Sequence, residues 1–428
     1  MVNVRNISKL MRSLAGTAGI FILGIIFSFI FNWSITKSLP QKEVGFFQYF
    51  ISIITFAMVI VPMGYQSLAQ REVINLNRNS IIRLSTQATI AIILGSIVFS
   101  FIWFFGVTEY RWVKDISDYS GLLVSIIIIP VYGLNIYFRA VLQGQNKIYS
   151  SIVPDVLIRP IILLSSLFFL PIIGIKINTT NLLWMLLVIL IGSLIYKIIT
   201  ATKNTLVKTT NVTLKNNWFK QAIFLLPIGL LSTINERVDV VMVTKILGPE
   251  SNAIYGVAFK FALFSGFGLV IFNQIMVPHY ASYFKDNSDK ENSEIQQKIK
   301  PNIRLAFALS TVIILVLMLL GEELLGWFGT PNEKYNLGYK TMLILSFGQL
   351  FNVAVGSTGY ILAMAKKESL VLISIGFGLI TNIVLNYLLV PSLKTEGAAI
   401  ATSASIVVWN LMMLIFVKKE TKINPTIF

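Results

Sequence analysis

Cysteine is absent from this sequence, which excludes disulfide bonds, Cys-ligated metal ions and thiol catalysis. His279 is the single histidine, so a metal site built from several imidazoles is excluded as well. Charged residues make up only 13% of the 428 residues, about half the share that is typical of a soluble domain. The sequence also lacks an ATP-binding Gly-rich loop and a Ser/His/Asp set. We therefore predict a protein that is not an enzyme and that needs no cofactor or metal ion.

Apolar residues make up 55% of the sequence and gather in runs that are long enough to cross a bilayer. Backbone groups in lipid must be paired within the chain, and these runs are too long for the strands of a β-barrel, so each is predicted to be a helix. We expect an all-α membrane protein with about 12 transmembrane helices. The predicted spans are 14–37, 44–66, 84–106, 120–142, 152–172, 181–200, 220–246, 253–277, 303–326, 338–362, 370–390 and 397–417.

Lysine and arginine are unevenly distributed among the loops between these spans. Most of them lie in one alternate set of loops, which includes the two longest, 201–219 and 280–302. Cytoplasmic loops of membrane proteins carry such an excess, so both termini are predicted to be cytoplasmic. The formal net charge of +16 is then explained by topology and by contact with anionic membrane lipid, without a nucleic-acid partner.

The loop at 201–219 divides the chain into two parts of six predicted spans each, which we assign as bundles 1–210 and 211–428. At an offset of 208 residues, the segment 37–40 (Lys-Ser-Leu-Pro) falls on the segment 245–248 (Lys-Ile-Leu-Gly). Each segment lies between the first and second span of its half. Because an even number of spans preserves orientation, we predict two repeats related by a pseudo-twofold axis along the membrane normal.

Three ionisable side chains lie within about one helical turn of the seventh predicted span: Glu236, Arg237 and Asp239. A charge at the centre of a bilayer costs about 2.5–3.5 kcal/mol even on a lenient scale, so such residues mark functional sites or pair with one another. Asn235, Glu236 and Asp239 share one helix face, while Arg237 projects to another side. This face is either the acidic lining of a hydrated cavity, able to bind a proton or cation, or part of a structural ion-pair network. We expect Glu236, Arg237 and Asp239 to border a crevice between the bundles.

Three further basic residues lie at membrane depth. Lys260, about two turns into the eighth span, either pairs with Glu236 or Asp239 or faces an anionic substrate. Arg139 and Lys197 each lie about one turn from a cytoplasmic span end. We predict that Lys197 snorkels to the membrane interface, whereas the sequence leaves the role of Arg139 open.

The fifth predicted span carries Asp155 and Arg159 at i, i+4, flanked by Pro154 and Pro160. This spacing either lets the two charges neutralise each other or leaves the guanidinium of Arg159 facing a substrate. The two prolines predict a kinked or broken helix, which is a common feature of transporter interiors.

Local sequence patterns carry a family resemblance. The segment 238–250 (VDVVMVTKILGPE) is followed by 254–258 (IYGVA), and the segment 382–402 contains Asn382, Asn386, Pro391 and a final EGAAIAT. These patterns are similar to the seventh-to-eighth and eleventh-to-twelfth spans of polysaccharide flippases, although Asn252-Ala253 stands where Val-Gly is common. The chain thus resembles the O-antigen flippases (Wzx-type) of the multidrug/oligosaccharidyl-lipid/polysaccharide exporter superfamily over nearly its whole length.

The resemblance implies two six-helix bundles around a V-shaped central cavity. It implies a flippase that moves an undecaprenyl-diphosphate-linked oligosaccharide, the repeat unit of O-antigen or capsule, from the cytoplasmic to the periplasmic leaflet. Such a protein resides in the bacterial inner membrane and works by alternating access. The implied partners are this lipid-linked substrate, membrane lipid, and a polymerase and chain-length regulator of lipopolysaccharide or capsule biosynthesis.

On this interpretation, some residues bind the diphosphate and sugars, and others couple transport to a proton or sodium gradient. The substrate-binding candidates are Arg159, Arg237, Lys260, Arg139 and Asn235, and the ion-coupling candidates are Glu236, Asp239 and Asp155. The alternative is a proton- or sodium-coupled multidrug efflux antiporter of the same superfamily, although the buried basic residues argue against cationic cargo. A peptidoglycan-precursor flippase and a membrane-embedded polymerase or ligase fit less well, since the first has additional spans and the second a large periplasmic loop.

Overall fold

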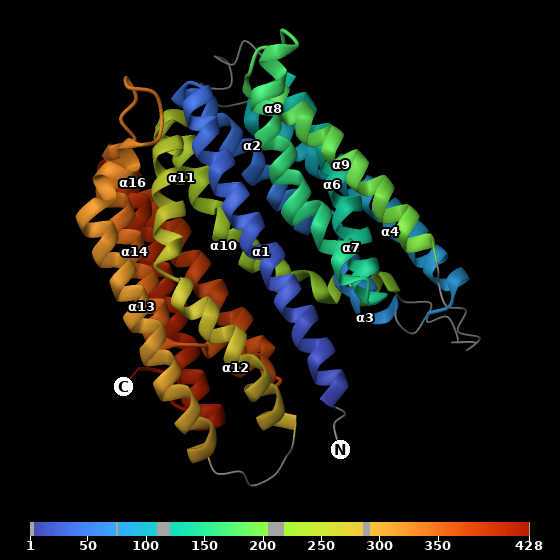
Figure 1. The fold of residues 1–428 in the computed structure, drawn as a ribbon, viewed down its shortest axis with the longest axis vertical. Helices are drawn as coiled ribbons and strands as arrows, with labels where there is room; N and C mark the ends of the chain where they lie inside the picture. Colours follow the sequence, from blue (N-terminus) through green and yellow to red (C-terminus); the bar gives the residue numbers. More distant parts are fainter. Residues whose placement is uncertain (1–3, 74–75, 109–119, 204–217, 286–291, 428) are drawn as a thin grey trace. The chain divides into compact units, whose positions relative to one another are not determined.

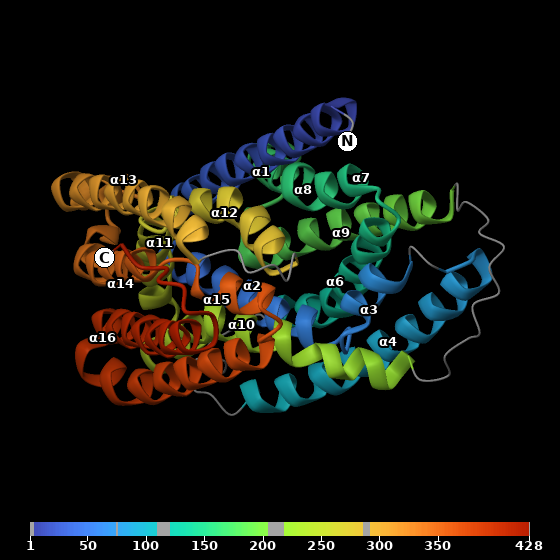
Figure 2. The ribbon, with the colours of Figure 1, turned by 90° about the horizontal axis from the view of Figure 1, so that it is seen from below.

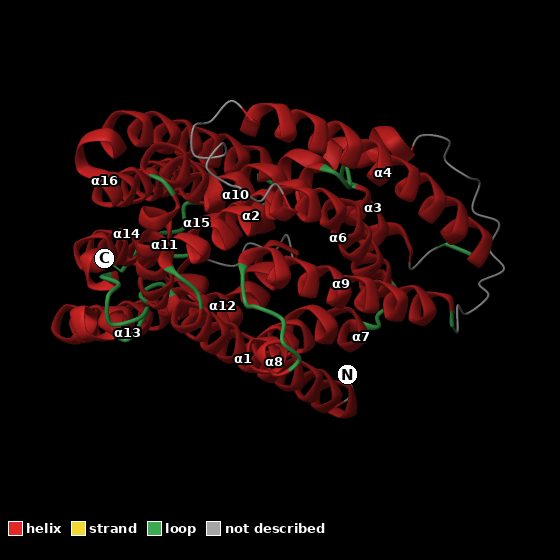
Figure 3. Cartoon of the chain, turned by 90° about the horizontal axis from the view of Figure 1, so that it is seen from above, coloured by secondary structure: helices red, strands yellow, loops and turns green. Residues whose placement is uncertain are grey.

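The computed structural model describes residues 4–73, 76–108, 120–203, 218–285 and 292–427. Within these ranges the chain consists of helices and connecting loops and contains no β-strand, which confirms the all-α prediction (Figure 3). The chain divides into two compact units, Met1–Leu230 and Leu231–Phe428. The division falls inside a helix, whereas the boundary predicted at residue 210 lies outside the described residues.

The helices of the N-terminal unit follow the first six predicted spans (Figure 1). Two of these spans are interrupted, one by a loop between α2 and α3 and one by a π-helical turn between α7 and α8. The elements are α1 (Val4–Ser38), α2 (Gln41–Ile60), α3 (Tyr65–Glu72), α4 (Arg78–Thr108), α6 (Ser120–Gly144), α7 (Ile148–Val153), the π turn (Pro154–Ile158), α8 (Arg159–Ile172) and α9 (Thr179–Thr202).

The C-terminal unit begins within α10 (Trp218–Leu247), the helix that contains the seventh predicted span. Its other elements are α11 (Pro249–Phe264), α12 (Phe267–Lys285), α13 (Asn292–Gly326), a 3-10 turn (Tyr335–Gly338), α14 (Tyr339–Val355), α15 (Thr358–Met364) and α16 (Glu368–Thr421).

Among the described residues, eight helices are long and apolar enough to span a membrane, or up to 10 if each of two bent helix pairs is one span. This count is below the predicted twelve. One reason is α16, whose 54 residues include both of the last two predicted spans. A straight helix of that length would measure about 80 Å, but Lys394 has non-helical backbone angles (φ 52°, ψ −132°) at the point where the two spans meet. The other reason is α10, which carries five ionisable residues, three of them within about one turn, and is not among the helices counted.

Three predicted spans are broken where we expected continuous helices. The second ends at Ile60, and the chain resumes as α3 after Gly64, whose φ of 82° disfavours any residue with a Cβ. The tenth breaks at Gly356, also at φ 82°, and α14 and α15 are bent by 42° there. The eighth bends by 47° between α11 and α12. Glycine conformations therefore set two of the three breaks.

The same pair of spans packs together in each unit. In the N-terminal unit, α6 lies beside α9, and Asn135 Nδ2 donates to the carbonyl of Leu190 at 2.8 Å (Figure 1). In the C-terminal unit, α14 lies beside the second half of α16, where Ser403 Oγ donates to the carbonyl of Ile344 at 3.0 Å (Figure 2). Both are contacts between the fourth and sixth spans of a half, which is the arrangement that a repeat predicts.

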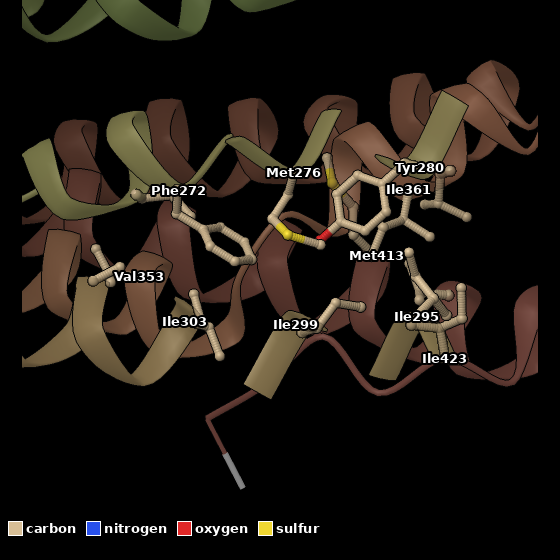
Figure 4. Close-up of a cluster of buried hydrophobic side chains, with 14 residues drawn as sticks. Phe272, Met276, Tyr280, Ile295, Ile299, Ile303, Val353, Ile361, Met413 and Ile423 are labelled. Atoms are coloured by element: carbon tan, nitrogen blue, oxygen red, sulfur yellow. The ribbon is translucent and has the colours of Figure 1, made fainter. Parts of the chain in front are cut away.

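An apolar cluster holds one end of the C-terminal unit together (Figure 4). Its members come from α12, α13, α14, α15, α16 and the segment after α16, and include Phe272, Met276, Tyr280, Ile295, Ile299, Ile303, Val353, Ile361, Met413 and Ile423. The segment after α16 is also held by two hydrogen bonds to the side chain of Gln296. The backbone N–H of Asn424 donates to Gln296 Oε1 at 3.0 Å, and Gln296 Nε2 donates to the backbone carbonyl of Asn424 at 2.6 Å. The end of the chain thus packs against the start of α13.

Candidate functional site

Polar side chains of the N-terminal unit converge from three helical segments. On α6, Tyr132, Asn135 and Arg139 recur at i, i+3 and i+7, so they lie on one face of the helix. On α9, Ser193 and Lys197 are four residues apart. The π turn between α7 and α8 brings Asp155 to the same region, because Asp155 contacts both Lys197 and Ser193.

Lys197 is fully buried, with 0% of its side chain exposed. Its Nζ lies 2.8 Å from both carboxylate oxygens of Asp155 and 3.1 Å from Asn135 Oδ1. The prediction that Lys197 snorkels to the interface is therefore wrong. Its partner Asp155 comes from a distant part of the chain, and burying the charge against a carboxylate replaces the hydration that snorkelling would have provided.

Asp155 does not neutralise Arg159, which was one of the two alternatives for this pair. Its ion pairs are with Lys197 at 2.8 Å and with Arg139 Nη1 at 3.8 Å. Arg159 instead donates from Nη1 to the hydroxyl of Tyr132 at 2.5 Å, and its Cζ lies 5.5 Å from the centre of that ring. The guanidinium of Arg159 is therefore held by an aromatic residue and not by a carboxylate.

The predicted irregularity of the fifth span is confirmed as a π-helical turn over Pro154–Ile158, where the Arg159 amide donates to the carbonyl of Pro154. Helix α1 packs against this turn through Gly24. A Cβ at Gly24 would lie 2.4 Å from the carbonyl oxygen of Val156, so only glycine permits this approach. The turn that carries Asp155 is thus fixed from the side of α1 as well as by Lys197.

In the C-terminal unit, Asp239 is buried at 2% exposure and surrounded by neutral hydrogen-bond donors. Helices α10 and α11 form a hairpin around Gly248, whose φ of 92° suits a residue without a Cβ. Across this hairpin the hydroxyl of Tyr255 donates to Asp239 Oδ2 at 3.1 Å. From α16, Thr402 Oγ1 donates to Oδ2 at 2.7 Å, and Asn386 Nδ2 donates to Oδ1 at 3.0 Å.

No basic side chain is among these partners of Asp239. They hydrogen-bond its carboxylate but do not neutralise its negative charge. Oxygen atoms gather around it: Asn382 Oδ1 accepts from Asn386 Nδ2 at 2.6 Å, and Asn386 Oδ1 is buried without a hydrogen-bond partner. A carboxylate with neighbouring neutral oxygens suits a hard monovalent cation, and a proton on the carboxylate would neutralise it equally well. The residues Asp239, Tyr255, Asn382, Asn386 and Thr402, which we call the Asp239 cluster, therefore have the chemistry of a site for a small cation or a proton.

The other candidates on α10 have a different environment from Asp239. Glu236 is exposed, while Asn235 and Arg237 are half-buried. The side chain of Asp239 is buried among residues of its own unit. That Glu236, Arg237 and Asp239 border a crevice between the bundles stays a prediction. A difference of one helical turn is enough to place Glu236 at the edge of the buried face and Asp239 in its middle.

Arg237 and Lys260 form the basic part of this unit. Arg237 has a buried Nε without a hydrogen-bond partner, and none of the ion pairs between described residues involves its guanidinium. Its positive charge acts on Lys260, which is half-buried beyond the hairpin turn on α11. The hydrogen-bond donors described for Asp239 are Tyr255, Asn386 and Thr402, so pairing of Lys260 with Glu236 and contact with an anionic substrate both stay predictions.

Reasoning from the sequence missed several members of these clusters as functional residues. Tyr132, Tyr255 and Thr402 are neutral and carry no charge that would mark them at membrane depth. One signal was present for the Asp239 cluster: Tyr255, Asn382, Asn386 and Thr402 all lie within the two segments that carry the family resemblance.

Comparisons with known proteins agree with this fold. The MatE family profile matches residues 228–388. The solved structure of the lipid II flippase MurJ, in an inward closed conformation, has a TM-score of 0.71 at 17% identity and covers 94% of this chain and 87% of that chain. An inward-facing multidrug resistance MATE family transporter of the MOP superfamily has a TM-score of 0.72 at 11% identity, covering 93% and 96%. The MATE multidrug transporter DinF-BH has a TM-score of 0.65 at 15% identity, covering 96% and 95%.

No curated protein matches the sequence. At these low identities the structural similarity establishes the fold, and the chain is a multi-pass membrane protein with the fold of MOP-superfamily transporters. A flippase and multidrug transporters share this fold, so the choice of cargo has to come from the side chains.

Proposed function

We propose that this protein is a flippase that moves an undecaprenyl-diphosphate-linked oligosaccharide from the cytoplasmic to the periplasmic leaflet of the bacterial inner membrane, with both termini cytoplasmic. The fold is compatible with this role, since the lipid II flippase MurJ shares it. The polyprenyl tail of such a substrate stays in lipid, so the protein has to lower the barrier only for the sugar–diphosphate head. A polymerase and a chain-length regulator are the partners that would use the product.

The observation that carries this proposal is the presence of two guanidinium groups, those of Arg159 and Arg237, in predicted spans without an ion pair among the described residues. Arg159 is hydrogen-bonded to the Tyr132 side chain, and no ion pair between described residues involves Arg237. The nearby carboxylates do not pair with them: Asp155 is paired with Lys197, and Glu236 is exposed. Holding such a cation out of water is costly unless an anion compensates it. A diphosphate, with one negative charge on each phosphate, supplies that compensation and accepts paired hydrogen bonds from guanidinium groups.

Energy coupling is assigned to the Asp239 cluster. Asp155, the other buried carboxylate, already has a fixed cation in Lys197 and so has little affinity left for a mobile one. Asp239 has neutral donors and can take up a proton or a sodium ion. The ion gradient then drives the conformational cycle because the ion binds one state more tightly than the other.

Multidrug efflux is the second candidate, favoured by the similarity to two MATE transporters and by the exposed carboxylate of Glu236. An antiporter of this kind would use a carboxylate to hold a cationic drug. Removing Glu236 would then abolish transport, whereas removing Arg159 or Arg237 would preserve or improve it.

Reconstituted proteoliposomes decide between the two functions. The assay follows the loss of dithionite-accessible fluorescence from a labelled undecaprenyl-diphosphate-linked sugar, and parallel vesicles report uptake of a fluorescent cationic drug. We expect flipping by the wild type and a loss of about tenfold or more in apparent affinity for Arg159→Gln and for Arg237→Gln, since each removes a charge-assisted hydrogen bond. Arg71→Gln is the matched control, because Arg71 is exposed and pairs with the neighbouring Glu72. Drug transport without lipid flipping, or full activity of both arginine variants, would overturn the proposal.

A further inference from the structure

The buried lysine Lys197 has no role in the function proposed so far. It is 0% exposed, so it does not touch a substrate in this structure. Its ammonium has three N–H donors, and the acceptors around it are the two carboxylate oxygens of Asp155 and the side-chain and backbone oxygens of Asn135. The donors of Lys197 are thus used up within the protein, and the residue influences a ligand through its neighbours, of which Asp155 is the nearest charged one, and not by direct contact.

Asp155 is the carboxylate that competes for the guanidinium groups of this cluster. It lies four residues before Arg159, at the spacing that favours an ion pair on one helix, and 3.8 Å from Arg139. Yet its shortest contacts, at 2.8 Å, are with Lys197. Because the attraction between charges falls with distance, the lysine is the dominant partner of the carboxylate.

The charge of the cluster follows from this competition. The cluster has three basic side chains (Arg139, Arg159 and Lys197) and one carboxylate, Asp155, whose shortest ion pair is with Lys197. The remaining positive charge resides on Arg139 and Arg159, which are both half-buried, while the ion pair of Lys197 and Asp155 is buried. Without Lys197, the carboxylate would pair closely with Arg159 or shorten its 3.8 Å contact with Arg139, and so neutralise one of the two guanidinium charges.

We infer that Lys197 is a positioning residue for anion binding: it holds Asp155 at 2.8 Å, so that the carboxylate pairs with Arg139 only at 3.8 Å and forms no ion pair with Arg159, and both guanidinium groups can bind the diphosphate of a polyprenyl-linked substrate. This inference rests on the proposed flippase function for the identity of the anion. It assigns the buried ion pair a purpose other than stability, which is consistent with the modest net stability that such pairs confer.

Binding of undecaprenyl diphosphate without sugar, measured by native mass spectrometry on detergent-purified full-length protein, tests the inference. Lys197→Met keeps the length of the side chain but releases Asp155, and we expect it to weaken binding about tenfold. The double variant Asp155→Asn/Lys197→Met has no carboxylate to release, and we expect its affinity to return to within about threefold of the wild type. Lys176→Met is the matched control, because Lys176 is exposed in the loop between α8 and α9 of the same unit.

Two results overturn the inference. One is wild-type affinity in Lys197→Met, and the other is a double variant that binds as weakly as Lys197→Met, because both would mean that Asp155 does not compete for the arginines. If Lys197→Met does not fold, Asp155→Asn replaces it: we expect tighter binding than in the wild type, and weaker binding by this variant contradicts the inference.

A ligand-free measurement separates this inference from the proposed function. The apparent melting temperature, followed by tryptophan fluorescence, gives the coupling between Asp155→Asn and Arg159→Gln in a double-mutant cycle. We expect a weak coupling in the wild-type background and a clearly stronger coupling in the Lys197→Met background, where the two charges pair. Should the wild type not bind undecaprenyl diphosphate, the proposed function fails, yet this cycle still decides whether Lys197 keeps Asp155 away from Arg159. Equal coupling in both backgrounds refutes the positional role.

Discussion

Replacing Asp239 with asparagine tests whether the buried carboxylate of the C-terminal unit binds the driving ion. Its three donors, Thr402, Asn386 and Tyr255, lie at 2.7, 3.0 and 3.1 Å. Hydrogen bonds to a charged acceptor contribute about 1.5–3 kcal/mol each, so the three together contribute about 4.5–9 kcal/mol. This is similar to the several kcal/mol that burying one uncompensated ion costs. The charged carboxylate is therefore tolerated, and a bound cation adds stability that the hydrogen bonds do not provide.

The size of that added stability follows from linkage. A ligand that binds only the folded protein stabilises it by about 2.7 kcal/mol at a concentration of roughly a hundred times its Kd. For a unit of roughly 200 residues this corresponds to a rise of about 5–10 °C in melting temperature. We expect the wild type to show this rise with its driving ion, and Asp239→Asn, which has no charge to compensate, to show none.

The assay is thermal unfolding of the purified protein, followed by tryptophan fluorescence, with sodium exchanged for choline at constant ionic strength and, separately, with protons added. Glu236→Gln is the discriminating control, since Glu236 lies one turn away on the same helix but is exposed. Glu72→Gln controls for the loss of a carboxylate from the surface. An ion response that survives in Asp239→Asn, or that disappears in Glu236→Gln, would refute the assignment of the coupling site.

Two further substitutions test the packing around these sites. Gly24→Ala places a Cβ 2.4 Å from the Val156 carbonyl oxygen, so we expect it to lower the free energy of unfolding by about 1–3 kcal/mol, measured by thermal unfolding. Gly19→Ala on the same helix is the control, because a Cβ there meets nothing within 4 Å and should cause no loss of stability. Gln296→Ala removes two hydrogen bonds to Asn424, and we expect a loss of about 1–3 kcal/mol in the free energy of unfolding. Gln297→Ala, at an exposed neighbouring position, serves as the control. Equal melting temperatures of the two variants would show that the contact between Gln296 and the segment after α16 contributes no stability.

The helices were predictable because lipid leaves an apolar run of about 20 residues few alternatives to a helix. The breaks in the second and tenth spans were not predicted, because they depend on the backbone angles that Gly64 and Gly356 adopt among many glycines that stay helical. Likewise, the break in α16 at Lys394 depends on a lysine with positive φ, a conformation that the amino-acid sequence does not predict for a lysine.

The site was predictable only in part, because charge at membrane depth is visible in a sequence and its partner is not. The list of charged candidates was complete enough to include Asp155 and Asp239. The partner of Asp155 is Lys197, which lies 42 residues away and looked like a snorkelling residue. The partners of Asp239 on α16 are neutral and lie 147 and 163 residues away. Tertiary proximity, and not local pattern, therefore decides which candidate is compensated.

The two buried carboxylates meet the same physical requirement in opposite ways. Asp155 is compensated by a cation that is covalently part of the chain, so its charge state is insensitive to the surrounding ions. Asp239 is surrounded by hydroxyl and amide groups, which hydrogen-bond its carboxylate but carry no charge. On the proposed function, a bound ion from the gradient supplies the neutralising charge. On the proposed function, a transporter of an anionic cargo needs both properties: a constant positive charge that recognises the diphosphate, and a variable charge that draws energy from the gradient. A lysine introduced near Asp239 should therefore abolish coupling, whereas removal of Lys197 from Asp155 should weaken recognition of the diphosphate about tenfold.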